Sequence, residues 1–445
     1  MGPDASLEPF FGALREAAQD LGVEAWIVGG YVRDAILGRA EPDLDVVVSN
    51  HAAEVAGKVA EALGLAPPVL FPRFGTAQLS AAGRRFEFAT ARSESYSSNS
   101  RKPAVRRASI LDDLLRRDFT VNALLMDLDG RVVDRVNGLV DLEQGLLRTP
   151  RDPDETFADD PLRMLRAIRF VAQLGFHLDP ALLPAMRRQR HRVQPPVLSP
   201  ERVAEELKKI LASERPRLAL ELMDEAGLLN ELLPELTACK GVRQGGYHIA
   251  DVFGHTLLAL QHSPPPLVVR LAVLLHDIGK PSTSAPDGSF HGHEKVGSEL
   301  TRVALERLRF ANVEVNQVAK LVALHLRPVY YRPDWTDGAV RRLAHDAGEA
   351  IGPLMDLARA DVAASAYPHP EWMEELDGRI QAVLQERPSR LDPPFDGEDV
   401  MRIRGLAPGP EVGRLKKELG QLIMEGTLAP EREAILEYLA TNPGL

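Results

Sequence analysis

Two aspartates near the N-terminus stand where a strand could present them together to a metal ion. Asp43 and Asp45 lie in the run DLDVVV, whose apolar residues predict a strand over residues 44–48. Residues two apart on a strand point to the same face of a sheet, so the two carboxylates share one face. Because like charges this close repel unless a cation lies between them, and because hard oxygen ligands suit Mg²⁺, the pair predicts a magnesium site. Such a site can hold a nucleoside triphosphate and activate a 3′-hydroxyl for in-line attack.

A glycine pair precedes these aspartates at an expected turn from strand to helix. The run AWIV predicts a buried strand over residues 25–28, and a short helix is expected over residues 31–37. Backbone N–H groups of Gly29 and Gly30 can bind a phosphate at this turn, and Arg33 adds positive charge there. The Asp-x-Asp pattern alone also fits a solvated strand end, but the glycine pair upstream favours the phosphate and metal interpretation.

The elements around these residues predict an α+β chain. A third carboxylate, Glu87, lies on another expected strand, residues 86–90. Strand, glycine pair, helix and strand indicate a small head with a mixed sheet, and the rest of the chain is helical by its apolar period. We expect a catalytic head at residues 1–140, a helical neck and body at 141–235, an all-helical metal-dependent domain at 236–370 and a helical tail at 371–445.

Composition narrows the class of protein. With 445 residues, of which 44% are hydrophobic and 26% charged, the chain is ordinary for a globular protein of several domains. The single cysteine, Cys239, excludes a disulfide framework and fits a reducing compartment, so we expect a cytoplasmic protein. Neither a signal peptide nor an apolar stretch of ~18 residues is recognisable, so no membrane partner is expected. A net charge of −11 argues mildly against a nucleic-acid partner, but a global sum hides local patches.

Five stretches in chain order resemble one family. The run GGYVRDAILGRAEPDLDVVV resembles the first motif of the class II tRNA nucleotidyltransferases, the CCA-adding enzymes, and of the bacterial poly(A) polymerases related to them. Four further stretches match in the same order: RRDFTVNALLMD (residues 116–127), DRVNGLVDLEQGLLRT (134–149), DDPLRMLRAIRF (159–170) and SPERVAEELKKIL (199–211). The resemblance implies a template-independent transferase that adds CMP and AMP from CTP and ATP to the 3′ end of tRNA, with Mg²⁺ held by Asp43 and Asp45.

The resemblance also implies roles for the second of these stretches. In the family, the motif RRDFTVNA contacts the ribose and triphosphate of the incoming nucleotide, which implies nucleotide binding by Arg117, Asp118 and Asn122. A charged helix start with local caps is the structural alternative.

The residues Asp160 and Arg163 have the chemistry to read a base. Cytosine and adenine each present an exocyclic amine donor beside a ring-nitrogen acceptor, so a carboxylate and a guanidinium match both. Uracil and guanine would leave buried groups unpaired. The family reads bases with an E-D-x-x-R pattern. In this chain Asp159 stands in place of the first residue, Glu. The base is read by the second and fifth positions of the pattern, so this difference does not affect base reading. Arg166 and Arg169 extend the same basic stripe, and an ion pair within the helix is the alternative interpretation.

Two basic clusters are candidates for RNA contact, because Lys and Arg bind phosphates without regard to sequence. They are Arg101, Lys102, Arg106 and Arg107 in a loop, and Arg187, Arg188, Arg190 and Arg192 near the helical neck. We expect the loop between Arg92 and Arg116 to move. In the family this region helps to switch specificity from C to A and is shortened in CC-only enzymes. Its length here therefore argues against CC-only addition. Its amino-acid sequence resembles that of the A-adding branch.

A second set of ligands follows in the helical part of the chain. Its members are His255, His276, Asp277, His293, His325 and Asp361. Neighbouring His and Asp at the end of the apolar run LAVLLHDIGKP are costly to bury unless they are paired or bind a metal. Imidazole and carboxylate ligands suit Ni²⁺, Mn²⁺, Fe²⁺ or Zn²⁺. For the HD pair alone, a helix C-cap is the alternative.

The order H…HD…D resembles the HD phosphohydrolase superfamily. The resemblance implies hydrolysis of 2′,3′-cyclic phosphates or related phosphoesters at a metal site. His291 is expected close to the ligands, whereas His248 and His262 are expected to be ordinary surface residues.

Several products and one other class of activity stay open at this stage. The transferase could add CCA, the terminal A, CC alone or a poly(A) tail. An HD phosphohydrolase whose head only holds RNA is the alternative from another class. A binding module without chemistry is disfavoured because both sets of ligands are intact.

Overall fold

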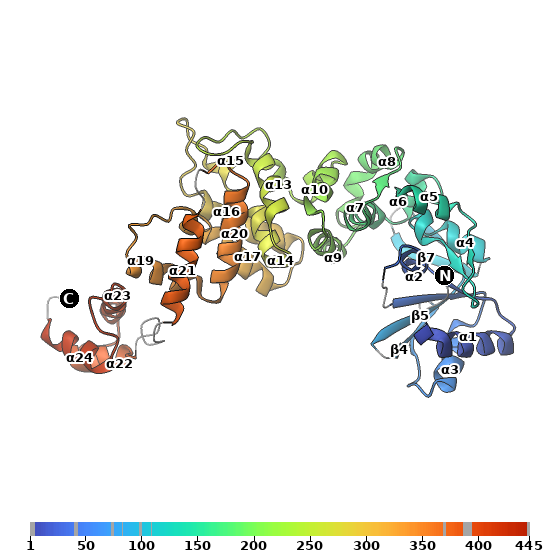
Figure 1. Cartoon of the computed structure of the whole chain (residues 1–445), viewed down its shortest axis with the longest axis horizontal. Helices are drawn as coiled ribbons and strands as arrows, with labels where there is room; N and C mark the ends of the chain where they lie inside the picture. Colours follow the sequence, from blue (N-terminus) through green and yellow to red (C-terminus); the bar gives the residue numbers. More distant parts are fainter. Residues whose placement is uncertain are drawn as a thin grey trace. The chain divides into compact units, whose positions relative to one another are not determined.

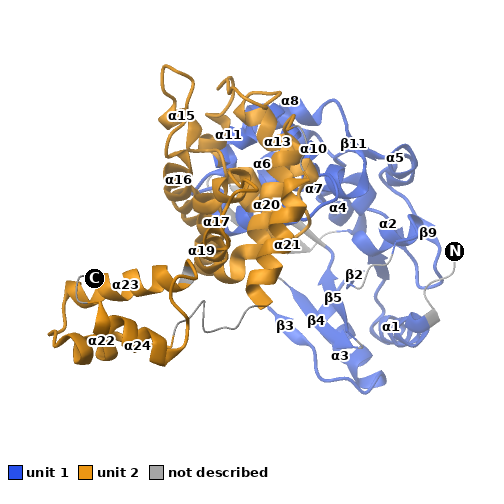
Figure 2. Ribbon diagram, turned by 60° about the vertical axis from the view of Figure 1, so that its left-hand side comes forward, with its two compact units in different colours: residues 1–232 blue, residues 233–445 orange. Residues whose placement is uncertain are grey.

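The computed structural model describes residues 5–39, 43–72, 75–81, 83–97, 100–107, 109–367, 371–385 and 394–442, without the side chains of residues 92–107 and 424. Its backbone contacts divide the chain into two compact units, Met1–Leu232 and Leu233–Leu445. The sheet belongs to the first unit, and the second is helical (Figure 1 and Figure 2).

A seven-stranded mixed sheet forms the head of the first unit. Its order is β3-β4-β5-β2-β1-β8-β9, with β2 parallel to β5 and antiparallel to β1. The strands are β1 (Ala25–Val28), β2 (Asp43–Val48), β3 (Val69–Phe71), β4 (Thr76–Ala81), β5 (Arg84–Thr90), β8 (Leu125–Met126) and β9 (Val132–Val133). The expected strands at residues 25–28, 44–48 and 86–90 and the α+β class with a mixed-sheet head are confirmed.

Helices pack on both sides of the central strands: Leu114 of α4 (Ile110–Leu115) clusters with Val28 and Val47 on the side of Asp45, and two other helices cover the opposite side. Helices α1 (Glu8–Leu21) and α3 (Ala52–Ala62) pack together, and α3 also packs on β4 and β5. Phe10 of α1 stacks on Phe86 of β5 with ring centroids 4.2 Å apart. Since alternate residues of a strand face opposite sides, Glu87 points away from the side on which Phe86 contacts α1.

The segment after β5 is a hairpin, and the expectation of a loop there was wrong. Strands β6 (Arg92–Ser97) and β7 (Ser100–Arg107) pair in antiparallel fashion and precede helix α4 (Ile110–Leu115). These strands are rich in Ser and Arg and lack the alternation of apolar residues that marks a half-buried strand. The sequence therefore showed no sign that these two segments pair as strands.

The rest of the first unit is built from short helices. Helix α7 packs on α9 and α10. The elements are α2 (Gly30–Ile36), η2 (Thr120–Asn122), α5 (Gly138–Gln144), β10 (Leu146–Leu147), α6 (Pro153–Asp159), α7 (Leu162–Leu174), β11 (His177–Leu178), α8 (Leu182–Gln189), η3 (Arg190–Val193), α9 (Pro200–Leu211), α10 (Pro216–Glu225) and α11 (Leu228–Leu232), and η1 (Ala5–Leu7) precedes α1.

The second unit has two helical parts. The first consists of α12 (Pro234–Thr237), α13 (Val252–His262), α14 (Leu267–Leu275), α15 (Lys280–Thr283), α16 (His293–Arg307), α17 (Asn312–Leu324), α18 (Leu326–Val329), α19 (Asp337–Ala347), η4 (Gly348–Ala350), α20 (Ile351–Ala363) and α21 (Trp372–Gln385). The tail consists of α22 (Gly397–Arg404), α23 (Pro410–Met424) and α24 (Arg432–Thr441), which share a hydrophobic cluster of their own. Over the ranges that the structure describes, every helix is too short or too polar to cross a membrane.

Candidate functional site

The three carboxylates of the head lie on one face of β2 and β5. Asp45 is the register partner of Glu87 in the parallel pair, and Asp43 lies two residues earlier on β2. The surrounding protein atoms raise the pKa of the Asp45 carboxyl by displacing water; Arg117 lowers this pKa, and the charges of Glu87 and Asp43 raise it further. A divalent cation would relieve this repulsion between acidic groups, so the residues present fit a hard metal ion such as Mg²⁺.

Gly29 brings the turn after β1 against these carboxylates. Its φ of 84° lies in a region that favours glycine. A Cβ atom at this position would lie 2.8 Å from Asp45 Oδ2 and 3.4 Å from Arg117 Nη1. The turn that ends at Gly30, the carboxylate and the guanidinium therefore meet at one place, where a negatively charged triphosphate would find both a cation and a metal ligand.

Other residues of the expected nucleotide set form a buried network. Arg33 Nη1 donates to Asn122 Oδ1 at 2.6 Å, and Asn122 Nδ2 donates to Asp118 Oδ1 at 3.0 Å. Arg166 Nε donates to Asp118 Oδ2 at 2.8 Å. Burial opposes ionisation of Asp118, but the Arg166 charge and the Asn122 hydrogen bond outweigh it and lower the pKa to about 2. The Arg33 guanidinium also binds Asp34 of the same helix, and its hydrogen bond to Asn122 links α2 to η2.

Phe170 of α7 joins this network to the rest of the helical body. The guanidinium groups of Arg33, Arg166 and Arg169 lie 5.1, 5.5 and 4.3 Å from its ring centroid. Arg169 Nε in turn donates to Glu206 Oε2 of α9 at 2.7 Å. The residues expected to bind nucleotide are thus connected from α2 to α9, although their signals lie in separate stretches of sequence.

Asp160 and Arg163 have other partners than each other. Asp160 ends α6 and accepts hydrogen bonds from Leu162 N at 3.1 Å and from Arg202 Nη2 at 2.8 Å. Arg163 donates to the backbone oxygens of Thr156 at 3.3 Å and Arg116 at 2.5 Å. The alternative of an ion pair within one helix was therefore wrong, because Asp160 lies before α7 rather than on it.

The two basic clusters differ in what the structure shows. Arg101, Lys102, Arg106 and Arg107 lie on β7, and their side chains fall outside the described part of the molecule. In the other cluster the partners are Glu225 for Arg187, Asp154 for Arg188, Glu231 for Arg190 and Gln189 for Arg192. Three of these four cations are therefore paired with acids of the same unit, which the sequence could not show because the acids lie on other helices.

The second set of ligands converges in the helical unit. His255, His276 and Asp277 form one group, and Asp277, His293 and His325 form another, each with its candidate ligand atoms within 4.8 Å of one another. His255 Nε2 also lies 2.9 Å from Asp361 Oδ1. All six side chains are buried. Asp277 belongs to both groups, so its carboxylate could bridge two ions.

Backbone carbonyls orient three of the imidazoles. Nδ1 of His276, His293 and His325 donates to the carbonyl three residues earlier, at 2.8, 2.7 and 2.6 Å. This leaves Nε2 of each ring as the metal-binding atom. Nε2 of His276 is buried and has no hydrogen-bond partner among the described residues. Burial lowers the pKa of His325 to about 3, which keeps that ring neutral. These features fit a divalent transition metal.

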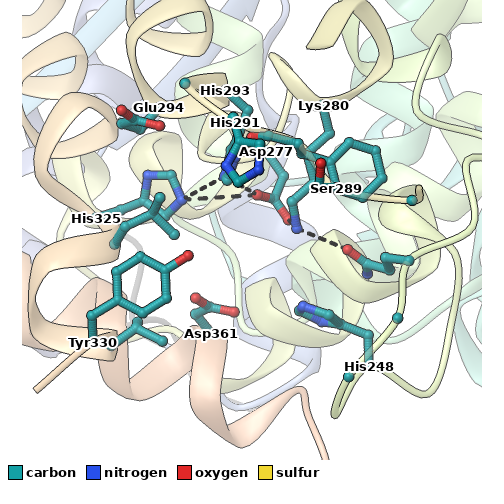
Figure 3. Close-up of a pocket in the computed structure, with 18 of the residues that line it drawn as sticks. His248, Asp277, Lys280, Ser289, His291, His293, Glu294, His325, Tyr330 and Asp361 are labelled. Carbon is teal, nitrogen blue, oxygen red and sulfur yellow. Dashed lines mark hydrogen bonds and ion pairs between the residues drawn. The ribbon is translucent and has the colours of Figure 1, made fainter. Parts of the chain in front are cut away.

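A cavity of about 590 Å³ opens onto these ligands (Figure 3). Lys280 Nζ donates to Asp277 Oδ2 at 2.7 Å and to Gln244 Oε1 at 2.8 Å. His248, expected as an ordinary surface residue, is half-buried and lines this cavity, as do Tyr330 and Tyr367. The sequence analysis missed these residues. Lys280 carried a signal, since it lies three residues after Asp277, whereas the tyrosines follow the ends of helices far apart in the chain.

Three family models match successive parts of the chain. The model of the "Poly A polymerase head domain" matches residues 25–148, that of the "Probable RNA and SrmB- binding site of polymerase A" matches residues 175–240, and that of the "HD domain" matches residues 241–362.

Two relatives match almost the whole chain. The A-adding tRNA nucleotidyltransferase of Deinococcus radiodurans is 34% identical over 94% of this chain and 96% of its own. The CC-adding tRNA nucleotidyltransferase of Thermus thermophilus is 36% identical over 92% of each. The solved structure of the Bacillus stearothermophilus CCA-adding enzyme in complex with CTP aligns with a TM-score of 0.72 and 23% identity over 99% of this chain and 98% of its own, which shows the same fold.

Proposed function

Because the chain belongs to the tRNA nucleotidyltransferase family, we propose that it adds nucleotides from CTP and ATP to the 3′ end of tRNA without a nucleic-acid template. The observation that carries the proposal is the approach of Gly29 and Arg117 to Asp45, on the strand face that also holds Asp43 and Glu87. Within the family, we favour CCA or terminal A addition over CC-only addition or a poly(A) tail, because the segment from Arg92 to Arg116, which carries the hairpin β6–β7, is of substantial length.

The chain's own residues divide the work of the transfer. Asp43 and Asp45 would hold Mg²⁺, with Glu87 as a weaker third carboxylate. The bound ion would neutralise the triphosphate and lower the cost of ionising the 3′-hydroxyl of the RNA. Arg117, beside the glycine turn, would bind phosphate oxygens, and the network from Arg33 to Arg166 would hold the nucleotide site in shape.

Asp160 and Arg163 would read the base. Their present hydrogen bonds to Arg202 and to backbone carbonyls fix both side chains in position. Each keeps capacity for a base, because a carboxylate has about four acceptor sites and a guanidinium five N–H donors. The carboxylate would accept from the amine of C or A, and the guanidinium would donate to the adjacent ring nitrogen.

The test is substitution of the carboxylates in the intact protein. We expect Asp45→Asn and Asp43→Ala to reduce extension of tRNA at least ~100-fold, a loss of ~3 kcal/mol in transition-state stabilisation. Asp129→Asn, at a head aspartate whose side chain is 67% exposed, is the control and should extend tRNA normally. Extension at the normal rate by both carboxylate variants would show that the metal assignment is wrong.

A second activity has its own observation in the helical unit. The sharing of Asp277 by two groups of oriented, buried ligands supports a metal-dependent phosphohydrolase acting on 2′,3′-cyclic phosphates or related phosphoesters. Bound ions of Ni²⁺, Mn²⁺, Fe²⁺ or Zn²⁺ would polarise the ester and activate water. Asp277→Asn should abolish hydrolysis and leave tRNA extension intact, whereas Asp45→Asn should do the reverse; loss of both activities in either variant would contradict two separate sites.

A further inference from the structure

Two tyrosines line the cavity of the HD site, a third packs against one of them, and none of the three belongs to the candidate metal ligands. Tyr330 and Tyr367 line the cavity. The ring of Tyr247 lies against that of Tyr367, with centroids 4.7 Å apart and planes tilted by 42°. The three residues come from separate segments, before α13, after α18 and after α20, so the fold brings them together.

Two of these tyrosines are exposed, whereas Tyr367 is half-buried. Tyr330 is 64% exposed and Tyr247 is 50% exposed. The next residue, Tyr331, is 5% exposed, and its hydroxyl donates to Glu375 Oε1 at 2.6 Å. Tyr331 thus has a structural role that Tyr330 lacks, and exposed aromatic surface beside a cavity is typical of a binding site.

The exposed rings are carried by backbone that is held in place. Ala366 N donates to the carbonyl oxygen of Tyr247 at 2.8 Å, which fastens the segment before α13 to the end of α20. Ser365 Oγ lies 3.4 Å from His248 Nδ1 across the same junction. A ring that is already positioned loses little conformational freedom when a ligand stacks on it.

The tyrosines are also close to the candidate metal ligands. Figure 3 shows the hydroxyl of Tyr330 and the carboxylate of Asp361 directed into the same space, with His325 beside them. A phosphate held at the ligands would therefore place its ester substituent within reach of the tyrosines. The cavity, at about 590 Å³, falls within the range of small-molecule sites and has room for more than a phosphate.

We infer that Tyr330 and Tyr367, the latter supported by the ring of Tyr247, bind the base of a nucleoside phosphoester by stacking, so that the HD site selects nucleoside esters over phosphate esters without a base. The inference rests on the proposed hydrolysis and names its substrate class and the residues that select it. Because every base has a π face, the selection is for a base as such and not for one particular base.

The test compares two monoesters in the full-length protein loaded with Mn²⁺ or Ni²⁺. Adenosine 2′-monophosphate carries a base, and β-glycerophosphate does not. We expect Tyr330→Leu and Tyr367→Leu to raise KM for the nucleotide by about 5- to 150-fold, the range of one stacked base, with little change in kcat. KM for β-glycerophosphate should not change. Ile249→Ala, at a residue that is 69% exposed and follows Tyr247 by two positions, is the surface control and should behave as wild type.

The outcomes separate the two proposals. Hydrolysis of neither ester by the wild-type protein would overturn the phosphohydrolase and the inference with it. Normal hydrolysis by the wild type, together with an unchanged KM or an equal change for both esters in the leucine variants, would overturn the base-binding inference alone.

Discussion

At Gly29 the backbone itself comes against the acidic group of the head. The residue has a φ of 84°, and an added Cβ would meet Asp45 Oδ2 at 2.8 Å. The contact limits position 29 to glycine for two separate reasons, conformation and space. Gly38 has a similar φ of 68°, but nothing lies within 4 Å of the position of its Cβ. The pair therefore allows strain to be separated from displacement of the carboxylate.

We predict that Gly29→Ala reduces tRNA extension at least tenfold because the new methyl group displaces the Asp45 carboxylate. Gly38→Ala, at a residue that also has positive φ but has open space around its Cβ position, should cost about 1 kcal/mol of stability and leave extension unchanged. Single-nucleotide extension rates and thermal unfolding of both variants give the comparison. Equal loss of extension in the two would mean that strain, not the approach to Asp45, accounts for the effect.

Asp118 and Arg166 form a buried pair whose removal we expect to be asymmetric. Arg166→Met removes the ion-pair partner of the buried Asp118 carboxylate and leaves it the hydrogen bonds from Asn122 Nδ2 and Phe119 N, so the free energy of unfolding should fall by about 2–4 kcal/mol at pH 7. Arg166→Met with Asp118→Asn removes the buried charge as well and should recover part of that loss. Denaturant unfolding measures both variants.

The pH dependence of the same pair follows from its pKa. Asp118 has a folded-state pKa of about 2 against an ordinary 3.8, so it stabilises the wild type fully above the ordinary value and loses that contribution as pH falls towards 2. In Arg166→Met the carboxyl would instead be protonated readily, so the gap to the double variant should close as pH falls to about 4. A gap that is independent of pH would contradict a charge effect.

At the scale of elements, strand parity decides which face carries chemistry. Glu87 and Phe86 are neighbours on β5, yet the phenylalanine contacts α1 and the carboxylate shares the other face with Asp45. This arrangement could be predicted, because a run such as DLDVVV indicates a strand, and successive side chains of a strand point to opposite faces of the sheet.

The hairpin β6–β7 tests whether an element outside the sheet sets the product. Ser93 and Arg106 are register partners, so residues 94–105 can be replaced by an Asn-Gly turn that keeps the base of the hairpin. We predict that AMP addition to a tRNA ending in C-C falls at least tenfold, while HD-site hydrolysis in the same variant stays normal. Unchanged AMP addition would exclude a role for the hairpin in adding A.

Contacts between elements are what the sequence could not supply. The link from Arg202 to Asp160 joins residues 42 positions apart, and Glu206 binds Arg169 from a neighbouring helix. Such partners depend on how helices pack. Apolar periodicity predicts which face of a helix is buried, but not which other helix packs against that face. The ligands of the HD site, by contrast, could be predicted from the sequence, because His and Asp are unusual residue types in buried apolar helices.

At the scale of the whole molecule, the two candidate sites lie in different compact units. Metal removal should therefore act on one unit at a time. We predict that stripping tightly bound transition metal lowers the melting temperature of the second unit by several degrees, since an ion that binds only the folded state stabilises it. Calorimetry of the wild type and of Asp277→Asn, which should not respond, measures this. An equal response in the variant would place the bound metal elsewhere.

The most direct test of the central claim is extension of three tRNA transcripts, ending before CCA, after C-C and at the complete CCA end. Each is incubated with CTP, ATP or both and resolved to one nucleotide. We predict either growth of the shortest transcript that stops at CCA, or growth of the C-C transcript alone by one A. No extension of any transcript would contradict the assignment of the head as a nucleotidyltransferase.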